Sequence, residues 1–158
     1  MGRGTIRVDL SELVRTAVDG FRARADDLEV GVRVEAREPL VADVDRERIG
    51  QVIGNLIDNA LRHTPRGGEV RITLAERGDA IELVVADSGP GVAPEERERV
   101  FARFYRVDKS RNKDGGGSGL GLAIVKAIVE LHGGSVMVRD ATEGGAAFVV
   151  RLPYASGP

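Results

Sequence analysis

The sequence predicts an α/β fold, organised as a two-layer sandwich with a mixed, mostly antiparallel sheet and about three helices on one face. Three observations lead to this prediction. Helix-like and strand-like segments are interleaved, several neighbouring strands are close enough in sequence to form hairpins, and each helical segment is apolar along one side. A chain of 158 residues is the size of one domain. We expect this domain to span residues 5–153, with tails at 1–4 and 154–158.

The first part of the chain holds two predicted strands and two predicted helices. Alternating apolar residues indicate strands at 5–10 and 30–34. Asp9, followed three positions later by a glutamate, is typical of a capping box, and here it would open a helix over about residues 10–25. A second helix is predicted at about 45–63, because its apolar residues recur every three or four positions. These residues are Ile49, Val52, Ile53, Leu56, Ile57, Ala60 and Leu61.

The second part of the chain is predicted to form two hairpins and a further helix. One hairpin pairs 70–74 with 81–85, and the other pairs 135–139 with 146–152. Between them a helix is expected at about 119–132, where a pair of glycines ends it. Its inward-facing residues are expected to be Leu120, Ile124, Ile128 and Leu131.

Composition and charge exclude several classes of function. Because the chain has no cysteine, it has no disulfide, no thiol catalysis and no cysteine-ligated zinc. Its formal charge of −2 argues against binding to nucleic acid through bulk charge, so we expect no nucleic-acid partner. No apolar run reaches the roughly 18 residues of a membrane-spanning helix.

The long helix at 45–63 carries polar residues on the side opposite its apolar stripe. Asn55 and Asn59 are four residues apart and therefore point the same way, with Arg62 on this side as well. Asparagine is only a middling helix former, so propensity does not explain its place in mid-helix. Two interpretations follow: the amide oxygens serve a hard cation such as Mg²⁺, or the residues form a solvated polar face.

A second motif, Asp87-Ser-Gly89-Pro-Gly91, stands at the end of a predicted strand. An ionised carboxylate can only accept hydrogen bonds. At the floor of a pocket it would accept from the exocyclic amine of adenine and repel the carbonyl of guanine, and the glycines would let a ligand approach the backbone. The alternative is that aspartate and glycine only form a turn.

A third motif is the glycine-rich run at 115–121, which leads into the last helix. Main-chain N–H groups at a helix N-terminus bind anions, and glycines expose such groups. The run has neither the spacing of a P-loop nor that of a dinucleotide-binding fingerprint. It indicates either a phosphate-binding loop or a flexible linker.

Aromatic and basic residues precede the glycine-rich run. Phe101, Phe104 and Tyr105 lie within five positions, and we expect them to make core contacts or to anchor a lid. Arg106 and Arg111 either belong to a solvated loop or contact the adjoining predicted phosphate site, since arginine suits bidentate contact with phosphate.

Taken in order, four segments resemble the motifs of the catalytic, ATP-binding domain of bacterial sensor histidine kinases. Residues 55–64 resemble the N box, 87–91 the G1 box, 101–104 the F box and 117–122 the G2 box. The resemblance covers residues 8–153, nearly the whole chain. It implies membership of the GHKL superfamily, whose Bergerat fold is an α/β sandwich with a mixed sheet.

The resemblance implies that the chain binds ATP and Mg²⁺ as the catalytic domain of a protein histidine kinase. Asn59 and Asn55 would be the Mg²⁺ ligands, with Arg62 as a further catalytic residue, and Asp87 would hold the adenine amine. The residues implied in nucleotide binding are Asn55, Asn59, Arg62, His63, Asp87, Gly89, Gly91, Phe104, Tyr105, Arg106, Arg111, Gly117, Ser118, Gly119, Leu120, Gly121 and Leu122.

The resemblance also implies partners for the chain. Nothing in the sequence resembles the phosphoacceptor motif, in which a histidine is followed by an acidic residue. The phosphoacceptor would therefore lie on a separate helical dimerisation domain of a parent kinase, which would indirectly serve a response regulator. The parent would be a homodimeric inner-membrane sensor, with this domain in the cytoplasm and monomeric when isolated. His132 is expected to be structural, at a helix end.

One departure from the family pattern concerns the strand that follows the last glycine box. That box often carries a hydroxyl residue before an aromatic, whereas here Ala146 and Ala147 precede Phe148. A hydroxyl from this strand is therefore missing as a link to Asp87.

Other functions within and beyond the superfamily are alternatives. One is an anti-sigma-factor-type kinase that phosphorylates serine on a protein partner. Another is an ATP-dependent conformational module like the DNA gyrase B subunit, although such proteins typically carry a glutamate base where this chain has Asn55, and an amide cannot take up the proton. A third is a domain that binds a partner without nucleotide.

Overall fold

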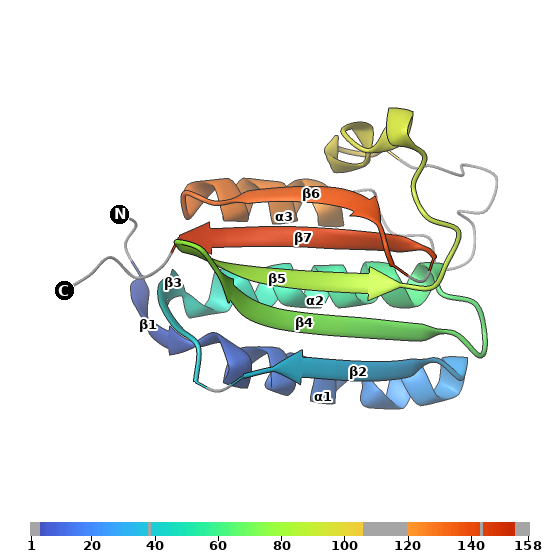
Figure 1. Ribbon diagram of the computed structural model, residues 1–158, viewed down its shortest axis with the longest axis horizontal. Coiled ribbons are helices and arrows are strands. Elements are labelled where there is room, and N and C mark those ends of the chain that lie inside the picture. Colours follow the sequence, from blue (N-terminus) through green and yellow to red (C-terminus); the bar gives the residue numbers. More distant parts are fainter. Residues whose placement is uncertain (1–3, 38, 106–119, 143, 154–158) are drawn as a thin grey trace.

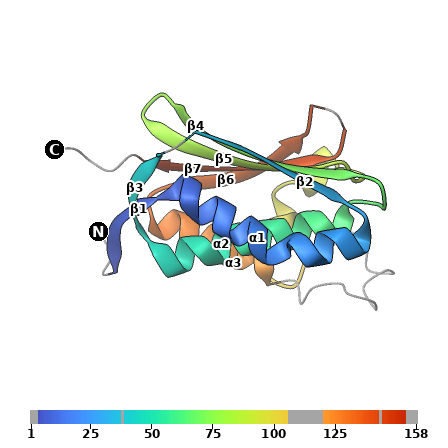
Figure 2. The same cartoon turned by 90° about the horizontal axis from the view of Figure 1, so that it is seen from below.

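The structure is a computed structural model that describes residues 4–37, 39–105, 120–142 and 144–153. In this part of the chain a mixed five-stranded sheet forms one layer and three α-helices form the other (Figures 1 and 2). The helices cover one face of the sheet only, and the opposite face is open (Figure 2). This arrangement confirms the predicted two-layer sandwich.

The five strands are mostly antiparallel, as predicted. Their spatial order is β2 (Gly31–Ala36), β4 (Glu69–Arg77), β5 (Ala80–Asp87), β7 (Ala146–Pro153) and β6 (Ser135–Asp140). Only the β2–β4 pair is parallel, which makes the sheet mixed. The hairpins β4–β5 and β6–β7 are the two that the sequence predicts. Two short 3₁₀ turns, η1 (Pro94–Glu96) and η2 (Arg99–Phe101), follow β5.

The middle helix of the helical layer is α2 (Arg46–His63), which packs against both α1 (Leu10–Leu28) and α3 (Gly121–Leu131). Its amphipathic pattern explains this place, because its apolar stripe faces the sheet and fills the core. Every residue of the predicted stripe is buried: Ile49, Val52, Ile53, Leu56, Ile57, Ala60 and Leu61. Among the described residues, no helix is long and apolar enough to cross a membrane.

Three details of the secondary structure differ from the prediction. A short strand β3 (Val41–Asp45) pairs with β1 (Thr5–Asp9) in a separate antiparallel sheet. The first helix continues to Leu28 and ends where Glu29 adopts a left-handed conformation with φ of 57°. The expectation that Leu131 faces inward is wrong, because its side chain is 73% exposed.

The exposure of Leu131 follows from the rotation of α3. The buried residues of this helix are Val125, Ile128 and Val129, and Leu122 packs against the core on the same side. At about 100° per residue, Leu131 points roughly 130° away from the centre of this stripe. His132 caps the end of α3, as expected of a structural histidine, and its Nε2 accepts from the main-chain N–H of Asp45 at 3.1 Å.

Candidate functional site

The polar side of α2 faces the start of α3. Asn55 is partly buried, and its Nδ2 donates to the main-chain carbonyl of Gly121, the first residue of α3, at 3.2 Å. This bond orients the amide and leaves Oδ1 as the oxygen that is available to a ligand. Asn59 lies one turn further on the same side and is also partly buried. The two asparagines therefore belong to the α2–α3 boundary, not to a fully solvated face.

Asp87 is the last residue of β5 and is only 4% exposed. Its Oδ1 accepts from the main-chain N–H of Gly89 at 2.8 Å and from that of Ala146 at 3.3 Å. None of the described residues donates a hydrogen bond to the second oxygen, Oδ2. The carboxylate is thus held rigidly through one oxygen, while the other remains open to a donor from a ligand.

The environment of Asp87 shifts the pKa of its carboxyl group upward. Burial raises the pKa of this carboxyl above its ordinary value, because a charge loses water contacts on burial. The hydrogen bonds from Gly89 and Ala146 and the nearby His63 lower the pKa and offset part of this effect. A buried carboxyl with a raised pKa at the end of a strand is typical of a functional site.

Three segments meet around Asp87, and glycine makes their close approach possible. A Cβ on Gly89 would overlap the carbonyl oxygen of His63 at the end of α2. A Cβ on Gly145 would overlap the carbonyl oxygen of Asp87 itself, and the φ of Gly145 is +90°. Gly91 has a φ of +83°, and a Cβ there would lie 3.4 Å from the carbonyl oxygen of Gly145. The turn after β5, the C-terminal end of α2 and the turn between β6 and β7 therefore lie against one another around Asp87.

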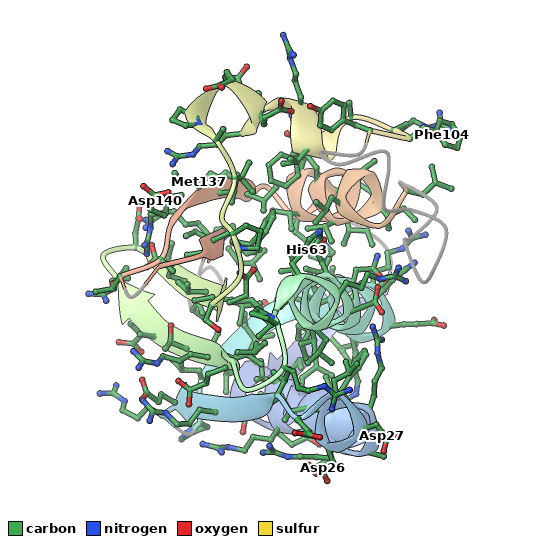
Figure 3. The ribbon with its side chains drawn as sticks, turned by 90° about the vertical axis from the view of Figure 1, so that its right-hand side faces the viewer. Asp26, Asp27, His63, Phe104, Met137 and Asp140 are labelled. Atoms are coloured by element: carbon green, nitrogen blue, oxygen red, sulfur yellow. The ribbon has the colours of Figure 1, made fainter. Side chains whose placement is uncertain are left out.

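Arg62 and His63 complete the C-terminal turn of α2. The Nε of Arg62 donates to Oδ2 of Asp58 at 2.8 Å, so an acidic residue of the same helix already holds this guanidinium. The Nδ1 of His63 lies 2.8 Å from the carbonyl oxygen of Asn59 and donates to it when protonated at that nitrogen. His63 is exposed at the end of α2 that faces the viewer in Figure 3.

The aromatic residues after η1 have different environments. Phe101 packs edge-on against Phe148, with ring centroids 6.0 Å apart, and Tyr105 packs against the core. Phe104 is instead 65% exposed with a φ of 66°, so it does not join the core. Leu120, Gly121 and Leu122 lie at the start of α3 beside Asn55. The other predicted site residues lie outside the described residues: Arg106, Arg111, Gly117, Ser118 and Gly119.

The amide oxygens on α2 suit a metal cation that is coordinated mainly by a bound small molecule and only partly by the protein. The described residues contain no cluster of three or more histidine, aspartate or glutamate side chains that could hold a metal ion by themselves. Asn55 offers an oriented amide oxygen, and Asn59 follows it on the same side. Mg²⁺ commonly binds in this way, through few protein oxygens together with water and phosphate.

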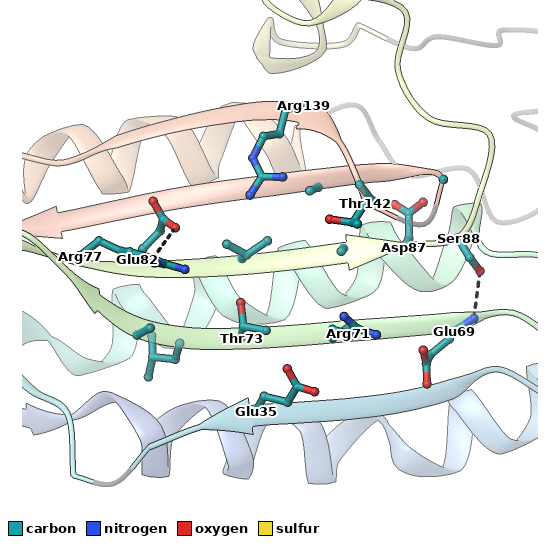
Figure 4. A pocket seen from close by; sticks show the side chains of 17 residues that line it. Glu35, Glu69, Arg71, Thr73, Arg77, Glu82, Asp87, Ser88, Arg139 and Thr142 are labelled. Carbon is teal, nitrogen blue, oxygen red and sulfur yellow. Dashed lines mark hydrogen bonds and ion pairs between the residues drawn. The ribbon is translucent and has the colours of Figure 1, made fainter.

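A hollow of about 410 Å³ lies on the open face of the sheet (Figure 4). Asp87 borders it at the end of β5, and some of the charged side chains over its floor are held in ion pairs. Glu82, for example, binds Arg151 at 3.1 Å and Arg77 at 3.6 Å. Because α2 lies behind the sheet, this hollow is separate from the asparagine side of the site.

Comparison with known proteins identifies the family of the chain. Residues 44–156 match the model of the family described as histidine kinase-, DNA gyrase B- and HSP90-like ATPases. The chain belongs to this family.

The relatives of this ATPase domain are sensor histidine kinases. The sensor-like histidine kinase SenX3 of Mycobacterium tuberculosis is 40% identical over 146 residues, which cover 92% of this chain and 36% of the relative. The chain thus spans about a third or less of the length of these curated relatives.

Solved histidine kinase structures share the fold of this ATPase domain. The catalytic domain of histidine kinase ThkA, in a nucleotide-free form, has a TM-score of 0.86 and 28% identity, and the match covers 97% of each chain. Full-length ShkA in complex with AMPPNP has a TM-score of 0.83 and 30% identity, over 99% of this chain and 32% of that one. The fold is that of a histidine kinase ATP-binding domain.

Two site residues of this ATPase domain escape prediction from the sequence. Gly145, in the turn between β6 and β7, lies against the carbonyl group of Asp87. Ala146, the first residue of β7, donates to Oδ1 of Asp87 across 59 positions of sequence. The glycine pair 144–145 before the strand is a signal of close backbone approach. Ala146 lacks the hydroxyl that the family often has before the aromatic residue of this strand. Its main-chain N–H nevertheless donates to Asp87.

Proposed function

We propose that the chain binds Mg·ATP and supplies the γ-phosphoryl group for phosphorylation of a histidine on a separate dimerisation domain of its parent kinase. The observation that carries the proposal is the carboxylate of Asp87, which is fixed through Oδ1 and open at Oδ2. A carboxylate oxygen that no described residue binds can accept from a ligand donor, and the exocyclic amine of adenine is one.

Each residue then has a distinct task. Asp87 selects the base. The phosphates would bind at the α2–α3 boundary, on the side of α2 that carries Asn55 and Asn59. Mg²⁺, when bound, neutralises charge on the phosphates and orients them. The protein's own contribution is positioning, which is the main catalytic effect in phosphoryl transfer. The complex of full-length ShkA with AMPPNP supports this use of the fold.

The proposed partners are a helical domain that carries the phosphoacceptor histidine and, indirectly, a response regulator. A structure of ThkA in complex with the response regulator TrrA supports this place in a two-component system. His132 does not suit the acceptor role, since its Nδ1 and Nε2 both make main-chain contacts. We further propose a homodimeric inner-membrane sensor as parent, with this domain in the cytoplasm and monomeric by itself.

The proposal is tested by calorimetry with Mg·ATP and Mg·GTP, followed by a transfer assay. We expect binding of ATP without measurable binding of GTP, and no stable phosphohistidine on the isolated chain. A separately purified dimerisation domain of the parent kinase should become phosphorylated on histidine when mixed with the chain and γ-labelled ATP. Absence of ATP binding, or phosphorylation of His63 or His132, would contradict the proposal.

Replacing Asn59 by Ala should reduce the Mg²⁺-dependent part of the affinity for ATP by about tenfold, because one oxygen ligand is lost. Affinity in the presence of EDTA should change little. The measurement is a calorimetric titration of ATP at several Mg²⁺ concentrations. Gln51→Ala is the matched control, since Gln51 is an exposed amide on the same helix two turns earlier. An unchanged Mg²⁺ dependence would exclude Asn59 as a ligand.

A further inference from the structure

A cluster of three charged side chains joins α1 to the C-terminal end of α2. Asp58 accepts from Nη1 of Arg24 on α1 at 2.5 Å through Oδ1, and from Nε of Arg62 at 2.8 Å through Oδ2. Arg24 also lies over the ring of Phe21, 5.9 Å from its centroid. Both carboxylate oxygens are therefore in use, and Arg24 has a second contact on its own helix.

The cluster keeps a net positive charge next to the site. The Asp58 carboxylate forms ion pairs with two guanidinium groups, those of Arg24 and Arg62. Two arginines and one carboxylate leave one positive charge, whereas an Asp58–Arg62 pair without Arg24 would be neutral.

Arg62 lies on the side of α2 where this positive charge would act on the phosphates. It stands seven residues after Asn55 and three after Asn59, so it shares their side of α2. Asp58 lies one turn before Arg62, toward α1, and binds it at Nε. The two terminal Nη groups are outside this bond, and they are the groups with which a guanidinium forms paired contacts to phosphate.

We infer that Asp58 is a positioning residue that holds Arg62 with its terminal nitrogens toward the nucleotide phosphates, while Arg24 keeps the cluster cationic. This inference rests on the proposed binding of Mg·ATP. It assigns to α1 an effect on phosphate binding, although no residue of α1 would touch the nucleotide. Asp58 acts here only through Arg62.

The inference is tested by whether Asp58→Ala raises or lowers the affinity for Mg·ATP. Removal of a negative charge near phosphate would by itself strengthen ATP binding. Loss of positioning should instead weaken it, and we expect the affinity for Mg·ATP to fall about 3- to 10-fold. Binding of adenosine, which has no phosphate, should not change. Asp58→Glu should restore part of the affinity, since an i,i+4 glutamate–arginine pair still forms.

Two further variants separate positioning from a structural role. In an Arg62→Met background, Asp58→Ala should cause no additional loss, because its effect passes through Arg62. Arg24→Met should weaken ATP binding but not adenosine binding. Its matched control is Arg22→Met, since Arg22 lies on the same helix and donates to the carbonyl of Val32 instead. Thermal unfolding of every variant shows whether it is folded at the assay temperature.

Each outcome decides the inference. A higher or unchanged ATP affinity of Asp58→Ala would overturn it, as would an equal loss for adenosine or an equal loss in the Arg62→Met background. If the unaltered chain binds adenosine and ATP with equal affinity, the cluster does not act on phosphate and only this inference fails. If the unaltered chain binds neither, the proposed function fails and the inference fails with it.

Discussion

Asp87→Asn is expected to lower the affinity for Mg·ATP at least about 100-fold while the affinity for Mg·GTP does not fall. The reason is the fixed orientation of the side chain. The main-chain N–H groups of Gly89 and Ala146 both donate to Oδ1, so the oxygen of the new amide must stay on that side. Its NH₂ group then replaces Oδ2, where it opposes the amine of adenine but can donate to the carbonyl of guanine.

Calorimetry with both nucleotides measures this change in base preference. Asp79→Asn is the matched control, because it makes the same chemical change in the exposed turn at the other end of β5. The control should bind both nucleotides as the unaltered chain does. Equal losses of ATP and GTP affinity in Asp87→Asn would show that the amide is not oriented by the two N–H groups.

The same variant should be more stable than the unaltered chain at neutral pH. The folded-state pKa of Asp87 is raised, mainly by burial, so its ionisation costs more in the folded than in the unfolded state. The unaltered chain therefore loses stability as the pH rises from the unfolded pKa through the raised folded pKa. Urea unfolding at several pH values should show the advantage of the variant above this window, and the advantage should shrink as the pH falls through it.

Gly145→Ala is expected to lower the free energy of unfolding by at least about 3 kcal/mol and to abolish ATP binding. A Cβ at this position would overlap the carbonyl oxygen of Asp87 and lie 3.0 Å from its Oδ1, and the φ of +90° is unfavourable for alanine. The hairpin before β7 would have to move away from β5, which would break the bond from Ala146 to Asp87. Chemical denaturation and calorimetry measure the two effects.

Gly144→Ala is the matched control for this prediction. Gly144 has a φ of +94°, but an added Cβ would meet nothing within 4 Å. The control therefore carries only the conformational cost of a positive φ, about 1 kcal/mol. The difference between the two variants isolates the contact with Asp87. Equal destabilisation would show that this contact does not constrain the hairpin.

Much of the fold could be predicted because its signals are local. The stripe of α2 has a helical period over 18 residues, and all seven predicted core positions are buried. The two hairpins are marked by alternation and by turn residues between neighbouring strands. The β1–β3 pair was not predicted, because β3 has five residues and its partner lies on the far side of α1 in the sequence. Leu131 was misplaced because the rotation of α3 depends on its packing.

The chemistry that the site can offer follows from residue type and spacing: the amides of Asn55 and Asn59 lie on one side of a helix, and Asp87 stands at a strand end beside glycines. These features can be predicted from short stretches of sequence, because they depend only on the type of each residue and its spacing from its neighbours.

Which oxygen of Asp87 is free depends on packing between distant segments, because the second donor to Oδ1 comes from Ala146 on another strand. Such packing likewise joins Arg24 to Asp58, 34 residues apart. Such pairs form where separate elements pack together. They cannot be predicted from either segment, because the whole core sets how closely two distant segments approach.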